Sequence, residues 1–313
     1  MYKASAPGST MLLGEYGVLY GAPALVCAMD KRMHVTLTPR YDTIINIQSD
    51  LHGSYTTDLN DLKIEKPFHF VLGAIKQHQA KMRRGCDIQI TSEFSDKIGL
   101  GSSAAVTVAT LAALVTWLDI RVQPLDLVRQ GRNVIRECQG LGSGADVAAS
   151  VYGGVVYYSP QPLAAEKFSV KLPLHLYYTG FKTPTVEAVK QVQNHFTSFP
   201  QVFKQLCAGI GQCVQDGVQM IRRGDIQKLG DVMNIQQGLM EAMGVSLPVI
   251  RQILSVLHDQ KDIIGAKISG SGMGDCVMGL GTVNQDIQFG NEYDDIQPVS
   301  VEMTLHGVQS KKS

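Results

Sequence analysis

Three glycine-rich turns place the strongest constraint on how this sequence can fold. They are GLGSSAA at 99–105, GLGSGAD at 140–146 and GSGMGDC at 270–276. Glycine allows tight backbone turns and lets another chain or a ligand approach closely. The first two turns precede segments of helical character, and the third joins two apolar segments of strand character. We therefore expect mixed helices and strands whose junctions are shaped for close backbone contact.

Hydrophobic periodicity predicts the elements between these turns. Buried-helix composition at 104–118 and 3.6-residue spacing elsewhere predict helices at 67–82, 104–118, 124–139, 184–196, 200–222, 225–243 and 247–260. A turn followed by a buried strand is predicted at 17–28, and strands or hairpins at 33–48, 86–94, 155–158, 174–178, 263–269, 277–280 and 299–305. Pro160, Pro162 and Pro173 mark an irregular passage. The sequence thus predicts two domains, 1–160 and 161–313.

Composition excludes several classes of protein. The 313 residues hold 28 Lys+Arg and 28 Asp+Glu, so no basic excess indicates a nucleic-acid or membrane-surface partner. The N-terminus has no secretory pattern, and no run reaches the roughly 18 apolar residues of a membrane span. The six cysteines are scattered without a C-x-x-C pair, which argues against a zinc knot. A cytoplasmic protein with reduced thiols is expected.

The first turn has the chemistry of a phosphate-binding loop. Its residues Gly99, Leu100, Gly101, Ser102, Ser103 and Ala104 open a helix. Free amides at a helix start attract phosphate, and serine hydroxyls can bind phosphate oxygens or Mg²⁺. The alternative is a simple turn capped by Ser102. The spacing is neither G-x-x-x-x-G-K-[ST] nor G-x-G-x-x-G, which argues against a nicotinamide dehydrogenase.

The other turns carry their own candidates. Asp146 can orient or deprotonate a substrate hydroxyl, or it can cap a helix. The 270–276 turn can pack its backbone against a ligand or another glycine loop, or it can be a tight connection between strands. Near the N-terminus, Pro7-Gly8 predicts a turn, and Glu15 is either a buried anchor or a substrate contact.

Three segments in this order resemble the motifs of the GHMP kinase superfamily. They are SAPGSTMLLGEYGVLYG at 5–21, IGLGSSAA at 98–105 and AKISGSGMGDC at 266–276. The mevalonate-pathway branch is most similar, on GEYGVLYG at 14–21, SGADVAAS at 143–150 and MNIQQGLMEAMGVSLPVI at 233–250. The resemblance implies ATP-dependent phosphorylation of mevalonate. Because GSGADVAASVYGG and Asp275 also resemble phosphomevalonate kinases, that acceptor remains an alternative.

The resemblance also implies a fold and a site. The fold is α+β in two domains: an N-terminal α/β domain with the phosphate loop, and a ferredoxin-like C-terminal domain. ATP and a small-molecule substrate would lie in the cleft between them, with Asp146 as base. Mg²⁺ would be held by Ser102 or Ser103 and by Glu137. The substrate residues implied are Glu15, Gly144, Gly270, Ser271 and Gly272. A homodimer is also expected from the branch.

One position departs from the superfamily pattern. The first motif usually has lysine where this chain has Ser9, and that lysine lowers the pKa of the substrate hydroxyl. We expect Lys182 to supply the missing charge, and Lys3 is a weaker candidate. Alternatively, Lys182 is simply an exposed lysine of a loop. The missing lysine suggests one rival function, a non-catalytic nucleotide-binding relative. A second rival with the same fold is a diphosphomevalonate decarboxylase, which would release CO₂ and whose second motif differs from GLGSSAA.

Overall fold

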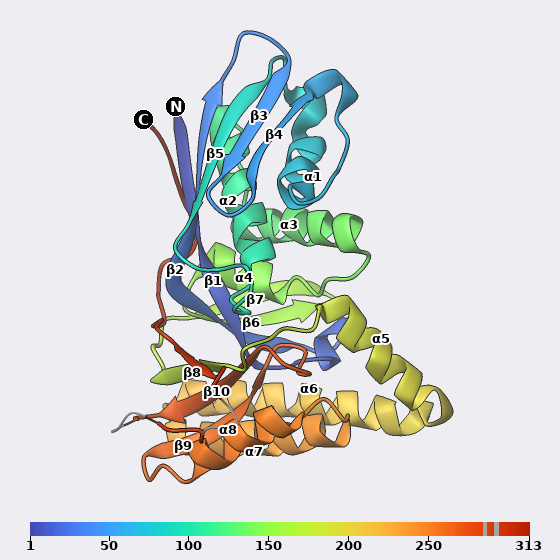
Figure 1. Ribbon diagram of the computed structural model, residues 1–313, viewed down its shortest axis with the longest axis vertical. Helices are drawn as coiled ribbons and strands as arrows, with labels where there is room; N and C mark the ends of the chain where they lie inside the picture. The colour runs from blue at the N-terminus through green and yellow to red at the C-terminus, as the bar shows by residue number, and fades with distance from the viewer. Residues whose placement is uncertain (284–286, 291–293) are drawn as a thin grey trace.

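Eight strands form the larger of two sheets in the chain, seen here in a computed structural model that describes residues 1–283, 287–290 and 294–313 (Figure 1). The strand order is β12-β1-β2-β5-β3-β4, and β6 pairs with both β2 and β7. Only the β3–β5 pair is parallel among the pairings described. The strands are β1 (Tyr2–Leu13), β2 (Ala24–Pro39), β3 (Ile44–Ser49), β4 (Gly53–Asp58), β5 (Cys86–Ser92), β6 (Val155–Pro160), β7 (Leu163–Phe168) and β12 (Gln309–Lys312).

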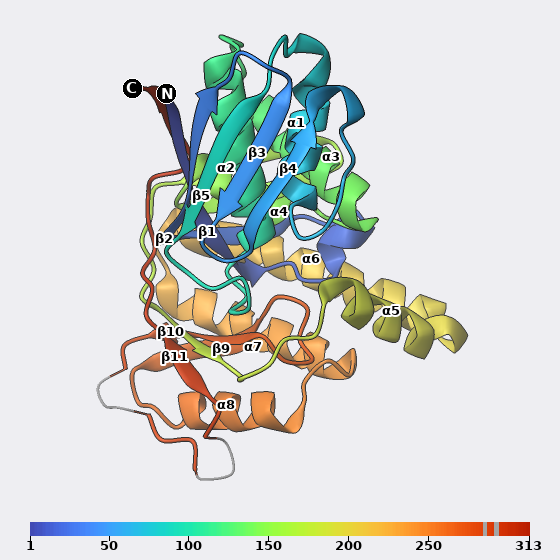
Figure 2. The ribbon, with the colours of Figure 1, turned by 45° about the horizontal axis from the view of Figure 1, so that its top comes forward.

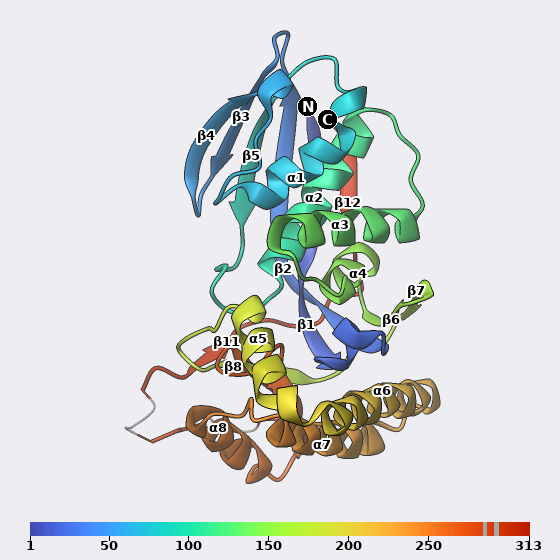
Figure 3. The ribbon, with the colours of Figure 1, turned by 90° about the vertical axis from the view of Figure 1, so that its right-hand side faces the viewer.

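Four helices cover one face of this sheet (Figures 2 and 3). They are α1 (His69–His78), α2 (Ser102–Trp117), α3 (Pro124–Gln139) and α4 (Ala145–Tyr152). Helix α2 carries no charged residue and packs against β1, β2, α1, α3 and α4. A helix that is apolar on all sides needs such surroundings, so the predicted buried core helix is confirmed.

The smaller sheet has the strand order β11-β8-β10-β9. Its strands are β8 (Leu174–Tyr178), β9 (Ile263–Ser269), β10 (Cys276–Gly281) and β11 (Gln297–Val299). In chain order the first and third strands lie inside and the second and fourth at the edges, which confirms the ferredoxin-like prediction. The described residues between β10 and β11 form no helix.

Four further helices belong to the second half of the chain. They are α5 (Thr185–His195), α6 (Pro200–Arg223), α7 (Ile226–Ala242) and α8 (Pro248–His258). Helices α7 and α8 pack against the smaller sheet, and α6 packs against α7 and against β1 and β2 of the larger sheet. Short 3₁₀ turns complete the list at Gly17–Tyr20, Leu59–Asp61, Gln79–Lys81 and Phe196–Ser198. Within the described residues, no helix combines the length and the apolarity that crossing a membrane requires.

Two strands that follow residue 160 belong to the larger sheet. They are β7 and β12, and β12 pairs with β1 so that the two termini lie side by side (Figure 1). We therefore propose that the second domain begins between β7 and β8 and that the last residues return to the first.

Two predicted local structures are wrong. The predicted strand at 299–305 is limited to β11 and one isolated bridge between Met303 and Met29. Beyond Val299 the chain bonds intermittently to residues 28–30, inside β2. Pro7-Gly8 is not a turn, because β1 continues through it with a shift of register between Pro7 and Ser9. At this bulge the Ser9 amide donates to the Leu100 carbonyl (3.0 Å), which ties β1 to the first glycine loop.

Candidate active site

The first glycine loop ends where α2 begins. Its cap residue is Gly101, in the left-handed conformation (φ 62°), and no side chain caps the helix. The predicted alternative of a cap by Ser102 is therefore wrong, because Ser102 is the first helical residue. A Cβ on Gly101 would lie 2.2 Å from Ser9 Oγ, so only glycine fits here. The amides that start α2 are left without a side-chain partner, which suits them to an anion.

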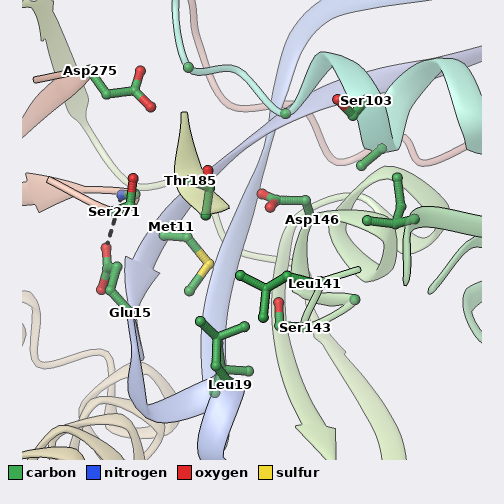
Figure 4. A pocket seen from close by; sticks show the side chains of 18 of the residues that line it. Met11, Glu15, Leu19, Ser103, Leu141, Ser143, Asp146, Thr185, Ser271 and Asp275 are labelled. Carbon is green, nitrogen blue, oxygen red and sulfur yellow. Dashed lines mark hydrogen bonds between the residues drawn. The ribbon is translucent and has the colours of Figure 1, made fainter. Parts of the chain in front are cut away.

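This loop lines a cavity of about 210 Å³ between the two halves of the chain (Figure 4). Five of its predicted residues line the cavity: Gly99, Gly101, Ser102, Ser103 and Ala104. Leu100 does not; its side chain is buried in the core, and its carbonyl accepts the bond from Ser9.

Asp146 faces the same cavity from α4. It is the second residue of that helix, and the cap is Gly144, so the predicted alternative of an N-cap aspartate is wrong. Its Oδ1 accepts a hydrogen bond from Ser9 Oγ at 2.8 Å. Burial raises the pKa of the Asp146 carboxyl above its ordinary value, while the Ser9 hydroxyl and the Lys182 charge act to lower it.

The turn before Asp146 is fixed by side chains from neighbouring elements. The Tyr158 hydroxyl donates to the Ser143 carbonyl (2.6 Å), and Arg136 Nε donates to the Gly142 carbonyl (2.8 Å). Gly144 has φ 94° and packs against Tyr158, where a Cβ would lie 2.6 Å from the hydroxyl oxygen. This turn therefore presents Asp146 in a fixed position.

The third glycine loop forms the opposite wall. Gly270 and Ser271 line the cavity, and the Tyr16 hydroxyl donates to the Ser271 carbonyl at 2.6 Å. Gly272, a predicted substrate residue, does not line the cavity, because its backbone packs against Val245. The prediction that this loop packs against the first half of the chain is confirmed by the bond from Tyr16 to Ser271 and by the Cys276 thiol, which donates to the Ile98 carbonyl at 3.2 Å.

Glu15 lines the cavity but is already bound on the protein side. Its two carboxylate oxygens accept from Lys267 Nζ and Gln236 Nε2, and the Gly270 amide donates to the same oxygen as Lys267 at 3.4 Å. Lys267 is 0% exposed, and burial lowers its pKa while Glu15 acts to raise it. Of the two roles that the sequence left open for Glu15, a buried anchor or a substrate contact, this arrangement fits the buried anchor.

A cation and a further acid complete the cavity. Lys182, on the segment before α5, lines it and lies 3.8 Å from Asp275 Oδ2. Burial raises the pKa of Asp275 to about 6, with the nearby Asp146 charge also raising it and Lys182 lowering it. Asp146 and Asp275 face each other across the pocket in Figure 4.

Glu137 does not belong to this site. It is exposed on α3, whereas Ile135 and Gln139 of the same helix line the cavity. Residues two apart on a helix lie on different faces, so the predicted metal acid points away from the cavity formed by its neighbours.

A second cavity of about 350 Å³ adjoins the first along the start of α2. Ser102, Ser103 and Gln139 line both. Its other walls are largely apolar or aromatic, with His52, Phe68, His69 and Phe70 among them.

Family models match both halves of the chain: the GHMP kinases N terminal domain over 69–154 and the GHMP kinases C terminal domain over 218–292. A mevalonate kinase from Pyrococcus abyssi is 31% identical over 297 residues, 88% of each chain.

The chain belongs to the GHMP kinase family. It is an ATP-dependent phosphotransferase, and the resemblance predicted from its glycine loops is confirmed.

Solved structures share this GHMP kinase fold, but they do not identify the molecule that accepts the phosphoryl group. The Methanococcus jannaschii mevalonate kinase is 22% identical with a TM-score of 0.78, covering 96% of this chain and 98% of that one. The Lactococcus lactis galactokinase complexed with galactose is 16% identical with a TM-score of 0.82, covering 98% and 94%. Since the two act on different molecules by name, the shared fold does not distinguish the acceptor.

Sequence reasoning missed two features of the site. Asp275 was noted only as part of a motif, and no local signal showed that the third loop would turn it toward Gly99. The Ser9–Asp146 bond joins residues 137 positions apart, so no spacing rule could have found it.

Proposed function

We propose that this GHMP kinase transfers the γ-phosphoryl group of ATP to the primary hydroxyl of mevalonate, giving 5-phosphomevalonate. One observation carries the proposal: the open amides of the first glycine loop and the carboxylate of Asp146 face one cavity. The mevalonate kinases among its relatives support this choice of acceptor, at about 30% identity over most of the chain.

Asp146 is the base in this reaction. It would accept the proton of the acceptor hydroxyl as that oxygen attacks the γ-phosphorus. On the opposite side of the phosphorus, the bond to the bridging oxygen would break, and that oxygen would leave with ADP. Ser9 holds Oδ1 of Asp146, which fixes the carboxylate without adding charge. A base whose pKa is raised by burial binds the proton more readily than an exposed aspartate does.

The nucleotide would occupy both cavities. Its phosphates would lie against the amides at the start of α2, and its nucleoside would extend past Ser102 and Ser103 into the aromatic second cavity. This places the phosphoryl group that is transferred between the glycine loop and Asp146.

Lys182 would supply the positive charge that Ser9 lacks. It lines the cavity, and its charge acts on both Asp146 and Asp275. A lysine here would stabilise the negative charge on the phosphoryl oxygens during transfer.

The residues of the site fit Mg²⁺, which neutralises phosphate charge when bound to a nucleotide. Mg²⁺ prefers oxygen ligands and is usually held by one or two protein groups together with substrate phosphates. The cavity offers the hydroxyls of Ser102 and Ser103 and a buried carboxylate oxygen without a partner on Asp275. The described residues hold no cluster of three His, Cys, Asp or Glu side chains arranged for a metal.

The charge of the cavity favours mevalonate over phosphomevalonate. Among the described residues that line it, Lys182 is the one lysine or arginine, and three carboxylates line it as well. A phosphorylated acceptor would add about two negative charges and would need further cations. An unphosphorylated hydroxy acid is therefore the better fit.

A coupled assay of ADP release tests this proposal with mevalonate, phosphomevalonate, homoserine and galactose in parallel. We expect turnover with mevalonate and at most slow turnover with the others. Release of CO₂ would indicate a decarboxylase instead. ATP binding without turnover on any alcohol would indicate a non-catalytic relative. A homodimer and a cytoplasmic location stay predictions, which sedimentation and cell fractionation can test.

A further inference from the structure

Two buried polar atoms of the third glycine loop have no hydrogen-bond partner. They are Oδ1 of Asp275, a residue 6% exposed, and Oγ of Ser271, a residue 9% exposed. Both residues line the main cavity. A buried polar atom without a partner costs about 1–3 kcal/mol, so two of them on one cavity wall indicate a ligand that satisfies them.

Asp275 lies against the phosphate loop. A Cβ on Gly99 would lie 1.8 Å from its Oδ1, so the carboxylate rests directly on the loop backbone. The Cys276 thiol next to it donates to the Ile98 carbonyl at 3.2 Å, which holds the two loops together. Any group that the phosphate loop binds must therefore lie close to this carboxylate.

The charges in the cavity favour a further cation at this point, beside Lys182. Glu15 is paired with Lys267, which leaves Asp146, Asp275 and Lys182 as the remaining charged side chains among the described residues that line the cavity. Their sum is one negative charge before a nucleotide adds its own. A carboxylate beside phosphate oxygens is repelled unless a cation lies between them.

We propose that Asp275 supplies the protein carboxylate that binds the divalent cation of the metal–nucleotide complex, in the role that the sequence assigned to Glu137. This inference rests on the proposed function, because it assumes that a nucleotide occupies the phosphate loop. It makes the third glycine loop a part of the metal site, so the second half of the chain takes part in binding the nucleotide.

Direct binding of Mn²⁺ tests the proposal, with free Mn²⁺ followed by electron paramagnetic resonance in the presence of a non-hydrolysable ATP analogue. We compare the wild type with Asp275→Asn and Glu137→Gln. Asn is isosteric with Asp and tolerates the left-handed backbone of residue 275 (φ 68°). Asp275→Gly, which also adopts this conformation, is a second variant, and thermal unfolding selects the variants that fold like the wild type.

We expect Asp275→Asn to weaken Mn²⁺ binding by at least about tenfold, as loss of a direct ligand should exceed the effect of an outer-shell change. Its affinity for the metal-free analogue should be unchanged or higher, because the variant removes a carboxylate that repels the phosphates, and Glu137→Gln should bind Mn²⁺ like the wild type. Wild-type Mn²⁺ affinity in Asp275→Asn, or a loss in Glu137→Gln instead, overturns the proposal. Failure of the wild type to bind the analogue at all, with or without metal, overturns the proposed function and this inference with it.

Discussion

At the scale of single residues, we expect Lys182 to replace the lysine that the superfamily usually has at the position of Ser9. It lies 3.8 Å from Asp275 and lines the cavity that Asp146 also lines. We expect Lys182→Ala to lower kcat by about 10²–10³-fold, the usual effect of removing a group that stabilises transition-state charge. Steady-state kinetics measure this, and Lys190→Ala, at an exposed position on α5, is the matched control. Unchanged kcat in Lys182→Ala would show that Asp146 works without this cation.

Ser9 should set the pH range in which the base is active. Its hydroxyl donates to Asp146 and lowers the pKa of that carboxyl, against the raising effect of burial. In Ser9→Ala the pKa of Asp146 should rise. Because the base must be deprotonated to act, the acidic limb of the kcat–pH profile should move to higher pH. An acidic limb that stays in place or moves to lower pH would contradict this role for Ser9.

Residue chemistry could be predicted where it depends on local pattern. Asp146 and five of the loop residues were found because a glycine turn followed by a helix start has a recognisable sequence. Glu137 was wrongly assigned to the site because the rotation of α3 about its axis decides which of its residues face the cavity. Gly272 was wrongly assigned because the loop turns its backbone toward Val245. Neither direction is encoded in the neighbouring residues.

At the scale of elements, the junction between the first glycine loop and α2 has no steric freedom. In Gly101→Ala the new Cβ would lie 2.2 Å from Ser9 Oγ, in a left-handed conformation that costs alanine about 1–2 kcal/mol. We expect nucleotide affinity to fall by about tenfold or more, as measured by calorimetric titration.

A second glycine provides the control for this junction. Gly140 is also left-handed (φ 74°), but nothing lies within 4 Å of its missing Cβ, and it does not line the cavity. Gly140→Ala should lose a similar amount of stability and keep its nucleotide affinity. Equal loss of affinity in both variants would mean that general backbone strain, and not the loop, is responsible.

Strands and helices with strong periodicity were predicted to within a few residues, and α3, β8 and β9 have the predicted bounds. The strand β12 (QSKK) was missed because all four of its residues are exposed, so no apolar alternation marks it. Pro7-Gly8 was misread because a bulge and a turn use the same residues, and only pairing with β2 tells them apart.

At the scale of the whole molecule, one buried ion pair links the two halves of the chain. Glu15 follows β1, Lys267 lies in β9, and both are buried. Removing one partner leaves a buried charge unpaired, so Lys267→Met should lower the free energy of unfolding by about 3–5 kcal/mol. Denaturant titration measures this.

The double variant tests the cause of that loss. Glu15→Gln with Lys267→Met removes both charges, so it should lose less than the sum of the two single variants. If the losses in the free energy of unfolding add, the two side chains contribute independently, and the ion pair does not link the two halves of the chain.

The central claim is that Asp146 and the first glycine loop act on one phosphoryl group in a shared cavity. The most direct measurement is single-turnover transfer of a labelled γ-phosphoryl group from ATP to mevalonate, for the wild type and Asp146→Asn. The account predicts labelled phosphomevalonate from the wild type, and a rate lower by about 10²–10⁴-fold in the variant with nucleotide affinity preserved. Transfer by Asp146→Asn at the wild-type rate would contradict it.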